Sequence, residues 1–384
     1  MISKESIRSK LPHLGTTIFA IMSKMANDNN AINLSQGFPD FDVSSELIEF
    51  INDAMVIGHN QYSPMPGILQ LKESIAMMLE ETYQFIVDPD KEITVTAGGT
   101  EAIYSTITAL VITGDEVILF DPAYDCYAPS IHLSGGKAVH IPLKQPDFSI
   151  DWEKVKLAIN DKTRMIMINS PQNPTGAVLS EQDLISLEEI VKDTNIIVLS
   201  DEVYEHIIFD GIVHQGVLRR KDLTERSVVI YSFGKTFHAT GWKIGYLVAP
   251  DWITAEIRKV HQFVVFTVST PMQVGLAKFA GNPDNYKYLP KFYQKKRDIF
   301  QDMVKDSRFE LIPCYGTYFQ LLSYKNISDL SDMEMAEKLT KEHGVASIPI
   351  SVFYEDGKDD KILRFCFAKS EETLEKAAQI LCKI

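Results

Sequence analysis

Two lysines, Lys235 and Lys243, lie eight positions apart in the segment SFGKTFHATGWKIGY, directly after the apolar run VVIYSF. A desolvated lysine amine can attack a carbonyl carbon or carry a proton, and a second amine nearby can neutralise an anion. Three other apolar runs also end in reactive or polar groups: ITVTA is followed by GGTEA, MIMIN by SPQNPTG, and IIVLS by DEVYEH. These groups act together only if the fold brings the ends of the four runs to one place.

The apolar runs predict the strands of one buried sheet. Near-continuous Val, Ile and Leu segments alternate with helical segments through the middle of the chain; the strands are expected at 93–97, 116–120, 165–169, 196–200 and 228–233, and the helices at 100–111 and near 180–193. This alternation is typical of an α/β fold, in which helices flank a mostly parallel sheet. Ligands of such sheets bind beyond the carboxyl ends of the strands, so the four polar segments are expected to converge.

After about residue 280 the pattern changes, which predicts a second, smaller α+β domain. A charged helix (284–306) precedes a strand pair within 309–324, a helix, the short run IPIS, the strand ILRFCFA and a final helix. The first forty or so residues contain one clear strand signal and are expected to pack with this domain. We therefore expect three segments: an N-terminal arm with part of the small domain (1–44), a large domain that carries the four polar segments (45–280) and a small C-terminal domain (281–384).

Taken one at a time, the polar residues also have structural explanations. Gly98, Gly99 and Thr100 could form a tight turn with a helix cap. Asp201 could hold a salt bridge, and Lys235 could be a solvated surface lysine. Together, however, the four segments favour a ligand that needs an amine, a carboxylate, a phenol, an amide and a helix N-terminus at once. Pyridoxal 5′-phosphate has these requirements, because it carries an aldehyde, a phosphate and a basic ring nitrogen.

The order of the motifs resembles that of the fold-type I pyridoxal-phosphate aminotransferases of class I/II. NPTG is followed by D-x-x-Y, S-x-x-K, G-W-K-x-G and a late R-x-x-F, and the similarity extends from NLSQGFPDF to ILRFCFAKS. Within the family, the chain is most similar to the methionine and kynurenine/glutamine aminotransferases. The resemblance implies an aspartate aminotransferase-like fold, with a seven-stranded sheet in the large domain.

The resemblance also implies roles at the cofactor ring. Lys235 would form the Schiff base with the cofactor aldehyde and, once displaced, would carry a proton to and from the substrate α-carbon. Asp201 would keep the pyridine nitrogen protonated. Tyr204 and Asn173 would hydrogen-bond the phenolate oxygen of the ring. Tyr124, in DPAYDCY, would stack on the ring, with core packing as the alternative.

The phosphate site is expected at a helix N-terminus. Gly99 and Thr100 would offer backbone N–H groups at the start of the 100–111 helix, where unpaired donors favour an anion. Ser232 and Lys243 would complete the site. The chain departs from the commoner family pattern at two positions: Gly234 replaces a frequent serine, and Lys243 replaces a frequent arginine. A point charge thus replaces a bidentate fork, so we expect a different phosphate geometry; a surface lysine is the alternative for Lys243.

Arg364 lies in the apolar strand ILRFCFA, where an unpaired guanidinium is costly to bury, so it needs an anion. The resemblance assigns it to the substrate α-carboxylate, and a structural salt bridge is the alternative. The other substrate-binding candidates are Gly37, Asn173, Phe19 and Phe353.

Substrate choice is expected to favour large apolar side chains. Segments 14–40 and 60–66 contain no arginine that could bind a distal carboxylate, but they do contain Phe19, Phe38 and Met65, and Phe266 of the partner subunit could add to them. An apolar pocket suits aromatic or thioether amino acids, in the methionine, phenylalanine, kynurenine and glutamine class, which would pass their α-amino group to a 2-oxo acid. Each of these apolar residues could equally belong to the core.

A homodimer with shared active sites is expected from Tyr62, in HNQYSPMPG. It matches a family tyrosine that crosses the subunit interface to the cofactor phosphate of the other subunit; packing within its own subunit is the alternative. Asn169 matches a further family position near the cofactor.

Composition excludes several other classes. A net charge of −14 without a basic stripe argues against nucleic acid as a partner. The chain has neither a continuous apolar stretch for a membrane span nor a signal-like N-terminus, so we expect no membrane partner and a cytoplasmic location. Four scattered cysteines form no CxxC pair, so neither a metal site nor a disulfide framework is expected.

Two other functions use similar residues. A pyridoxal-phosphate carbon–sulfur β-lyase or a cyclopropane-forming synthase could share this set, and dependence on a keto acid would separate them from an aminotransferase. A cofactor-sensing regulator would need an attached DNA-binding module, but only about forty residues precede the predicted core and they are not basic.

Overall fold

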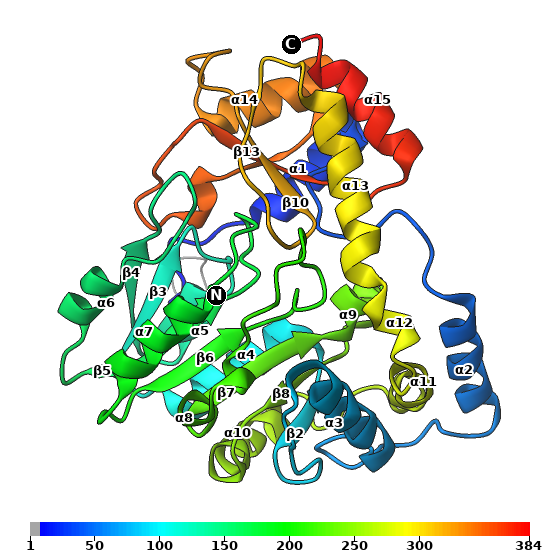
Figure 1. Cartoon of the computed structure of the whole chain (residues 1–384), viewed down its shortest axis with the longest axis vertical. Helices are drawn as coiled ribbons and strands as arrows, with labels where there is room; N and C mark the ends of the chain where they lie inside the picture. The colour runs from blue at the N-terminus through cyan, green and yellow to red at the C-terminus, as the bar shows by residue number, and fades with distance from the viewer. Residues whose placement is uncertain (1–7) are drawn as a thin grey trace, which may run out of the picture.

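The apolar runs form the central sheet of this computed structural model, which describes residues 8–384 (Figure 1). Seven strands stand in the order β2-β8-β7-β6-β5-β3-β4. Their bounds are β2 Ile93–Thr96, β3 Glu116–Asp121, β4 Lys137–Pro142, β5 Thr163–Asn169, β6 Ile197–Asp201, β7 Ser227–Ser232 and β8 Gly245–Val248. β8 is antiparallel to both of its neighbours and all other neighbours are parallel, which confirms the expected mostly parallel sheet of seven strands.

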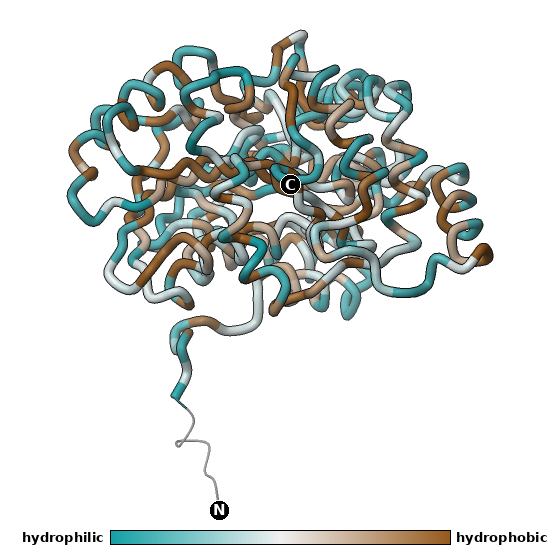
Figure 2. The backbone as a smooth tube through the Cα atoms, turned by 90° about the horizontal axis from the view of Figure 1, so that it is seen from below, coloured by the Kyte–Doolittle hydropathy of each residue, from teal (hydrophilic) through white to brown (hydrophobic). Residues whose placement is uncertain are grey.

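Helices cover both faces of this sheet, so its strands, apart from the edge strand β4, are largely buried on both sides. In β3, for example, Val117 and Leu119 contribute to one apolar cluster, whereas Ile118 and Phe120 contribute to the other. The first cluster includes residues of α4 Gly98–Leu110, α5 Tyr127–Leu133 and α10 Asp251–Val264. The second includes residues of α2 Ser45–Val56, α3 Leu69–Tyr83, α6 Trp152–Ala158, α7 Glu181–Val191 and α11 Thr270–Ala280. Figure 2 shows the apolar stretches running mainly through the interior.

A second sheet lies above the first and is antiparallel. Its order is β12-β13-β10-β9, with bounds β9 Glu310–Leu311, β10 Phe319–Ser323, β12 Ile348–Pro349 and β13 Ile362–Cys366. It packs with α13 Leu289–Val304, α14 Asp332–Lys338 and α15 Glu371–Leu381 (Figure 1). The helix expected over 284–306 is divided into α12 Asp284–Lys287 and α13, with Pro290 in the first turn of α13.

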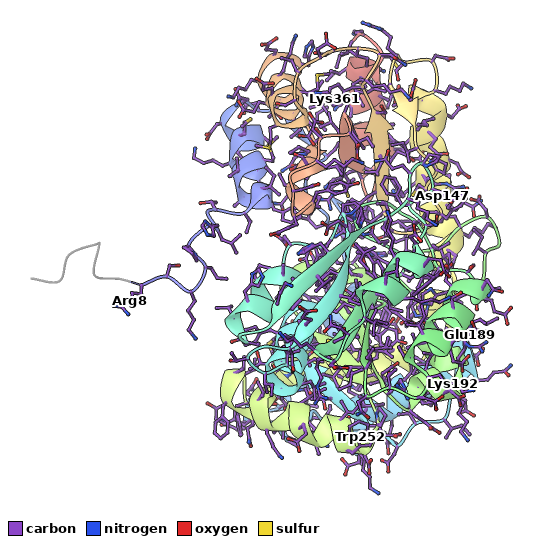
Figure 3. The ribbon with its side chains drawn as sticks, turned by 90° about the vertical axis from the view of Figure 1, so that its left-hand side faces the viewer. Arg8, Asp147, Glu189, Lys192, Trp252 and Lys361 are labelled. Atoms are coloured by element: carbon purple, nitrogen blue, oxygen red, sulfur yellow. The ribbon has the colours of Figure 1, made fainter. Side chains whose placement is uncertain are left out.

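The N-terminal part of the chain lies with this second sheet. α1 Ile18–Asp28 leads to β1 Ile32–Asn33, which pairs in parallel with β11 Val345–Ala346. The chain before α1 projects away from the body, as Figure 3 shows at Arg8. The predicted boundaries at residues 44/45 and 280/281 stay predictions.

The two parts meet over the carboxyl ends of the large sheet. In Figure 3, Trp252 lies at the end of the large part that is far from the small part, and Lys361 lies in the small part. Asp147 lies near the level at which the two parts meet. Within residues 8–384, no helix combines the length and apolarity needed to cross a bilayer.

Candidate active site

A cavity of about 350 Å³ opens at the carboxyl ends of the strands, where the sequence predicts convergence. Most of the predicted site residues line it: Gly37, Gly99, Thr100, Tyr124, Asn169, Asn173, Asp201, Tyr204, Ser232, Lys235 and Lys243. They come from the start of α4, from the ends of β5, β6 and β7 and the loops after them, from the loop between β3 and α5, and from the loop that follows β1. Four other predicted residues, Tyr62, Phe19, Phe353 and Arg364, lie outside its lining.

Lys235 lies in the short helix α9 Phe233–Thr236, which begins directly after β7. Its Nζ donates to the hydroxyl of Tyr318 at 2.8 Å and to the carbonyl of Gly37 at 3.3 Å. Burial lowers the pKa of this amine to about 8, because a charged ammonium loses its hydration in the interior. A substantial share of the amine is therefore neutral, and nucleophilic, near neutral to mildly alkaline pH.

Asp201 ends β6 and holds a buried carboxylate. The hydroxyl of Tyr127 donates to its Oδ2 at 2.6 Å, and the N–H of Val203 donates to its Oδ1 at 3.3 Å. Burial raises the pKa of Asp201 to about 6, since the two donors only partly offset the loss of hydration. A cationic N–H in the cavity would be a suitable partner for this group.

Asn169 links the strand ends below the cavity. Its Nδ2 donates to the backbone carbonyl of Asp201 at 2.8 Å, and its Oδ1 accepts from the N–H of Asn173 at 2.9 Å. Sequence reasoning missed Tyr127, which is the first residue of α5 and follows Tyr124 by three positions. The rings of Tyr124 and Tyr127 lie edge to face, with centroids 5.7 Å apart.

The start of α4 forms a cradle for an anion. Gly98 has φ +77°, and a Cβ at this position would lie 3.3 Å from the Nζ of Lys243, which places the ammonium beside the helix N-terminus. The first N–H groups of a helix, here those of Gly99 and Thr100, have no partner within the helix. Donors, helix dipole and ammonium together favour a phosphate-sized anion.

The departure at Gly234 has a steric reason. A Cβ at this position would lie 3.1 Å from the Cα of Thr240 and 3.4 Å from the Oγ of Ser232, so a serine side chain there would crowd the backbone. Thr240 itself lines the cavity.

Arg364 on β13 is only 1% exposed, yet it has no acidic partner among residues 8–384 within ion-pair distance. Its two terminal nitrogens donate to the Oδ1 of Asn173 at 2.7 Å and to the carbonyl of Ser35 at 3.0 Å, and its Nε has no partner in this part of the chain. The structural salt bridge considered as an alternative is therefore absent from the described structure. A buried, unpaired guanidinium next to the cavity is suited to a carboxylate ligand.

Aromatic rings surround this guanidinium. Its central carbon lies 3.8 Å from the ring centroid of Phe319, 5.2 Å from that of Phe19 and 5.7 Å from that of Phe353. Phe353 is buried in the core, while Phe19 is partly exposed. Phe319 was missed, because GTYF reads as an ordinary strand start; only packing brings it onto Arg364.

Tyr62 does not line the cavity of its own chain. Its side chain is 85% exposed and packs edge to face on Phe266, with centroids 5.4 Å apart. Phe266 is itself half-exposed and has φ +70°. Within residues 8–384, no three His, Cys, Asp or Glu side chains are grouped in a way that could hold a metal ion.

The chain matches known aminotransferases along nearly its whole length. The family model for aminotransferase class I and II matches residues 29–381. The chain is 50% identical to the methionine aminotransferase of Escherichia coli strain K12 over 97% of both chains. It is 33% identical to the kynurenine–oxoglutarate transaminase of Dictyostelium discoideum, over 96% of this chain and 94% of the relative. The crystal structure of YbdL from Escherichia coli, identified as a methionine aminotransferase, superposes with a TM-score of 0.97 at 50% identity, covering 98% of this chain and 99% of that one.

The chain therefore belongs to the class I and II aminotransferases. It is an aminotransferase with the fold of this family, whose members are generally dependent on pyridoxal phosphate and act on amino acids and 2-oxo acids.

Proposed function

We propose that this enzyme transfers the α-amino group of methionine, or of another large apolar or aromatic amino acid, to a 2-oxo acid, with pyridoxal 5′-phosphate bound in the 350 Å³ cavity. The observation that carries the proposal is the pair formed by a partly buried amine, Lys235, with its pKa lowered to about 8, and a buried guanidinium, Arg364, without an acidic partner among residues 8–384. The amine can react with a carbonyl carbon, and the guanidinium can bind a carboxylate. A reaction at the α-carbon of an amino acid requires both groups.

The residues of the cavity fit the cofactor. Lys243 and the N–H groups at the start of α4 would hold the phosphate, and Asp201 would pair with the ring N–H, because a buried carboxylate with a raised pKa gains most from a cationic partner. Tyr124 would lie against the ring, and Tyr204 would donate to its oxygen. When bound, the cofactor supplies an electron-accepting ring for the electron pair left at the α-carbon.

Lys235 would move the proton in this reaction. Its amine takes the proton from the α-carbon at Nζ and can return it, and a pKa near 8 lets it do both close to neutral pH. Arg364 and Asn173 would hold the α-carboxylate, so that the α-hydrogen points at Nζ. Gly37 brings its carbonyl near the same amine, since a Cβ there would lie 2.7 Å from the ring of Phe319.

Substrate preference follows from the residues around Arg364. Phe19, Phe319 and Phe353 make its surroundings apolar, and within residues 8–384 no arginine lines the cavity. A distal carboxylate would thus be buried without a partner, whereas a thioether or an aromatic ring would be buried favourably. The 50% identity to a methionine aminotransferase supports the same preference.

We also propose a homodimer in which Tyr62 reaches the phosphate of the partner subunit's cofactor. Support comes from its 85% exposure and from its not being among the residues that line its own cavity. Further exposed apolar side chains, Val56, Ile57, Phe263 and Leu14, would also be covered more favourably by a second copy than by water.

A panel of amino acids incubated with holoenzyme and without keto acid tests the proposal, because each donor that reacts converts the cofactor and shifts its absorbance. Methionine, phenylalanine and kynurenine should exceed aspartate by at least about tenfold in kcat/KM. Aspartate as the best donor would contradict the proposed substrate class. An S-substituted cysteine, whose sulfur lies on the β-carbon, is added to the panel to test the alternative: repeated release of a thiol, pyruvate and ammonia without any keto-acid acceptor would instead indicate the β-lyase.

A further inference from the structure

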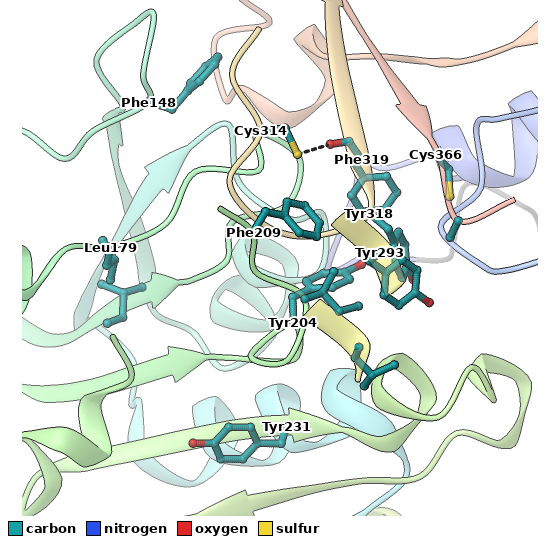
Figure 4. Packing of buried hydrophobic residues seen from close by; sticks show 14 of the residues in the cluster. Phe148, Leu179, Tyr204, Phe209, Tyr231, Tyr293, Cys314, Tyr318, Phe319 and Cys366 are labelled. Atoms are coloured by element: carbon teal, nitrogen blue, oxygen red, sulfur yellow. Dashed lines mark hydrogen bonds between the residues drawn. The ribbon is translucent and has the colours of Figure 1, made fainter. Parts of the chain in front are cut away.

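A tyrosine that no sequence motif indicates lies closest to the reactive amine. Tyr318 is fully buried and lies just before β10, in the small part of the molecule, whereas Lys235 belongs to the large part. The Nζ of Lys235 lies 2.8 Å from the hydroxyl of Tyr318. The ring is held on several sides: its centroid lies 5.1 Å from Tyr204, 4.9 Å from Phe319 and 5.8 Å from Tyr293 (Figure 4). Its hydroxyl is therefore a fixed point and not a mobile group.

The hydroxyl of Tyr318 already donates its proton to a hydrogen bond. Tyr318 donates to the carbonyl of Gly37 at 2.6 Å, and burial raises the pKa of the phenol well above its usual value, so the proton is retained. A phenol has one proton to donate, so towards Lys235 the oxygen acts as an acceptor. The carbonyl of Gly37 is a second acceptor for Nζ, at 3.3 Å.

This arrangement orients the amine. A neutral lysine has two N–H bonds and one lone pair, and the two acceptors attract both N–H bonds. The lone pair is then directed away from Tyr318 and Gly37. Because Lys235 lines the cavity, this leaves the lone pair available to a ligand there.

We propose that Tyr318 is a positioning residue that aims the lone pair of Lys235 at the carbon with which the amine reacts. The inference rests on the proposed function, and it gives the small part of the molecule a direct contact with the reactive amine of the large part. Misdirecting a reacting atom is costly even when every reacting group remains present.

Tyr318→Phe removes one oxygen and keeps the ring with its packing, so the fold is expected to persist. The loss has two measurable effects on Lys235. An acceptor stabilises the ammonium more than the neutral amine, so its removal lowers the lysine pKa further. Without the acceptor the amine also rotates freely, so its reaction with an aldehyde slows at alkaline pH, where all of the amine is neutral.

The test uses cofactor-free enzyme and free pyridoxal, which lacks the phosphate and so does not depend on the anion cradle. The rate of covalent capture is followed by absorbance between pH 6 and 10, with Lys235→Ala as the blank. Tyr318→Phe should move the pH midpoint down by about one unit and reduce the plateau rate by about tenfold. Tyr293→Phe is the matched control, since it removes an equally buried hydroxyl that bonds the Nδ1 of His238 and not Lys235.

An unchanged midpoint and plateau in Tyr318→Phe, or equal changes in Tyr293→Phe, would overturn the inference. Failure of the proposed function looks different, because wild-type enzyme would then capture no more pyridoxal than Lys235→Ala. A second readout uses holoenzyme and methionine deuterated at the α-carbon. Tyr318→Phe should lower kcat and raise the isotope effect, with KM changed by less than about twofold, whereas a merely structural role would leave the isotope effect unchanged.

Discussion

Replacing Arg364 by leucine separates a substrate-binding arginine from a structural one. The guanidinium is buried, donates only to Asn173 and Ser35, and leaves its Nε without a partner among residues 8–384. A substrate carboxylate would supply two charge-assisted hydrogen bonds in a planar, bidentate arrangement. Leucine removes these bonds but keeps an apolar side chain against the rings of Phe19 and Phe319.

The size of the effect follows from those two bonds. Each hydrogen bond to a charged group contributes about 1.5 to 3 kcal/mol, so their loss should cost about 3 to 6 kcal/mol of transition-state binding. This corresponds to a fall of about 10² to 10⁴-fold in kcat/KM, with a raised KM and the absorbance of the bound cofactor intact. The free energy of unfolding of the cofactor-free variant should be at least that of wild type, because the substitution removes a buried charge that has no acidic partner among residues 8–384.

Arg297 provides the matched control. It is equally buried on α13, but its guanidinium pairs with Asp210 at 2.6 Å and with Asp298 at 2.7 Å. Arg297→Leu should therefore lose about 2 kcal/mol of unfolding free energy. Its kcat/KM should stay within about threefold.

The assay compares methionine with 3-(methylthio)propylamine, which lacks only the carboxylate. Wild type should prefer methionine by the same 10² to 10⁴-fold, and Arg364→Leu should lose that preference. Activity of Arg364→Leu within about tenfold of wild type, or loss of bound cofactor together with stability, would refute the reasoning and assign the arginine to the fold.

Three further predictions concern the lysine and the dimer. Lys235→Ala should lose the borohydride-trapped link to the cofactor and essentially all turnover, and normal transamination by this variant would contradict the mechanism. In cofactor-free enzyme the lysine pKa is about 8, against about 10.5 when unfolded, so the unfolded state binds more protons between these values. The unfolding free energy of wild type relative to Lys235→Ala should thus rise from pH 8 to 10.5, by up to about 3 kcal/mol, and urea titrations giving a flat difference would contradict the lowered pKa. Tyr62→Asp and Lys235→Ala, each inactive alone, should recover up to about half of the wild-type activity per heterodimer when refolded together, because one site of a two-fold dimer then carries neither change; no recovery would mean that Tyr62 serves its own subunit.

Much of the site was predictable because its residues lie at element ends that are encoded locally. Apolar runs give the strands, and the polar segments after them must meet at one edge of a parallel sheet. Lys235, Asp201 and Asn173 could thus be assigned to one cavity before any coordinates. Two strands of the large sheet, β4 and β8, were not singled out, since β4 is a mixed-polarity edge strand and β8 begins with a glycine, which weakens a strand pattern.

Only the tertiary structure decided which groups touch. Tyr318 and Lys235 are 83 residues apart in the chain, and Arg364 and Asn173 are 191 apart, so no local pattern reports either contact. Within residues 8–384, packing also leaves Arg364 without a carboxylate at ion-pair distance and places Tyr62 outside the lining of its own cavity. Periodicity and turn chemistry are set by neighbours along the chain, whereas these distances are set by how the two sheets and their helices pack together.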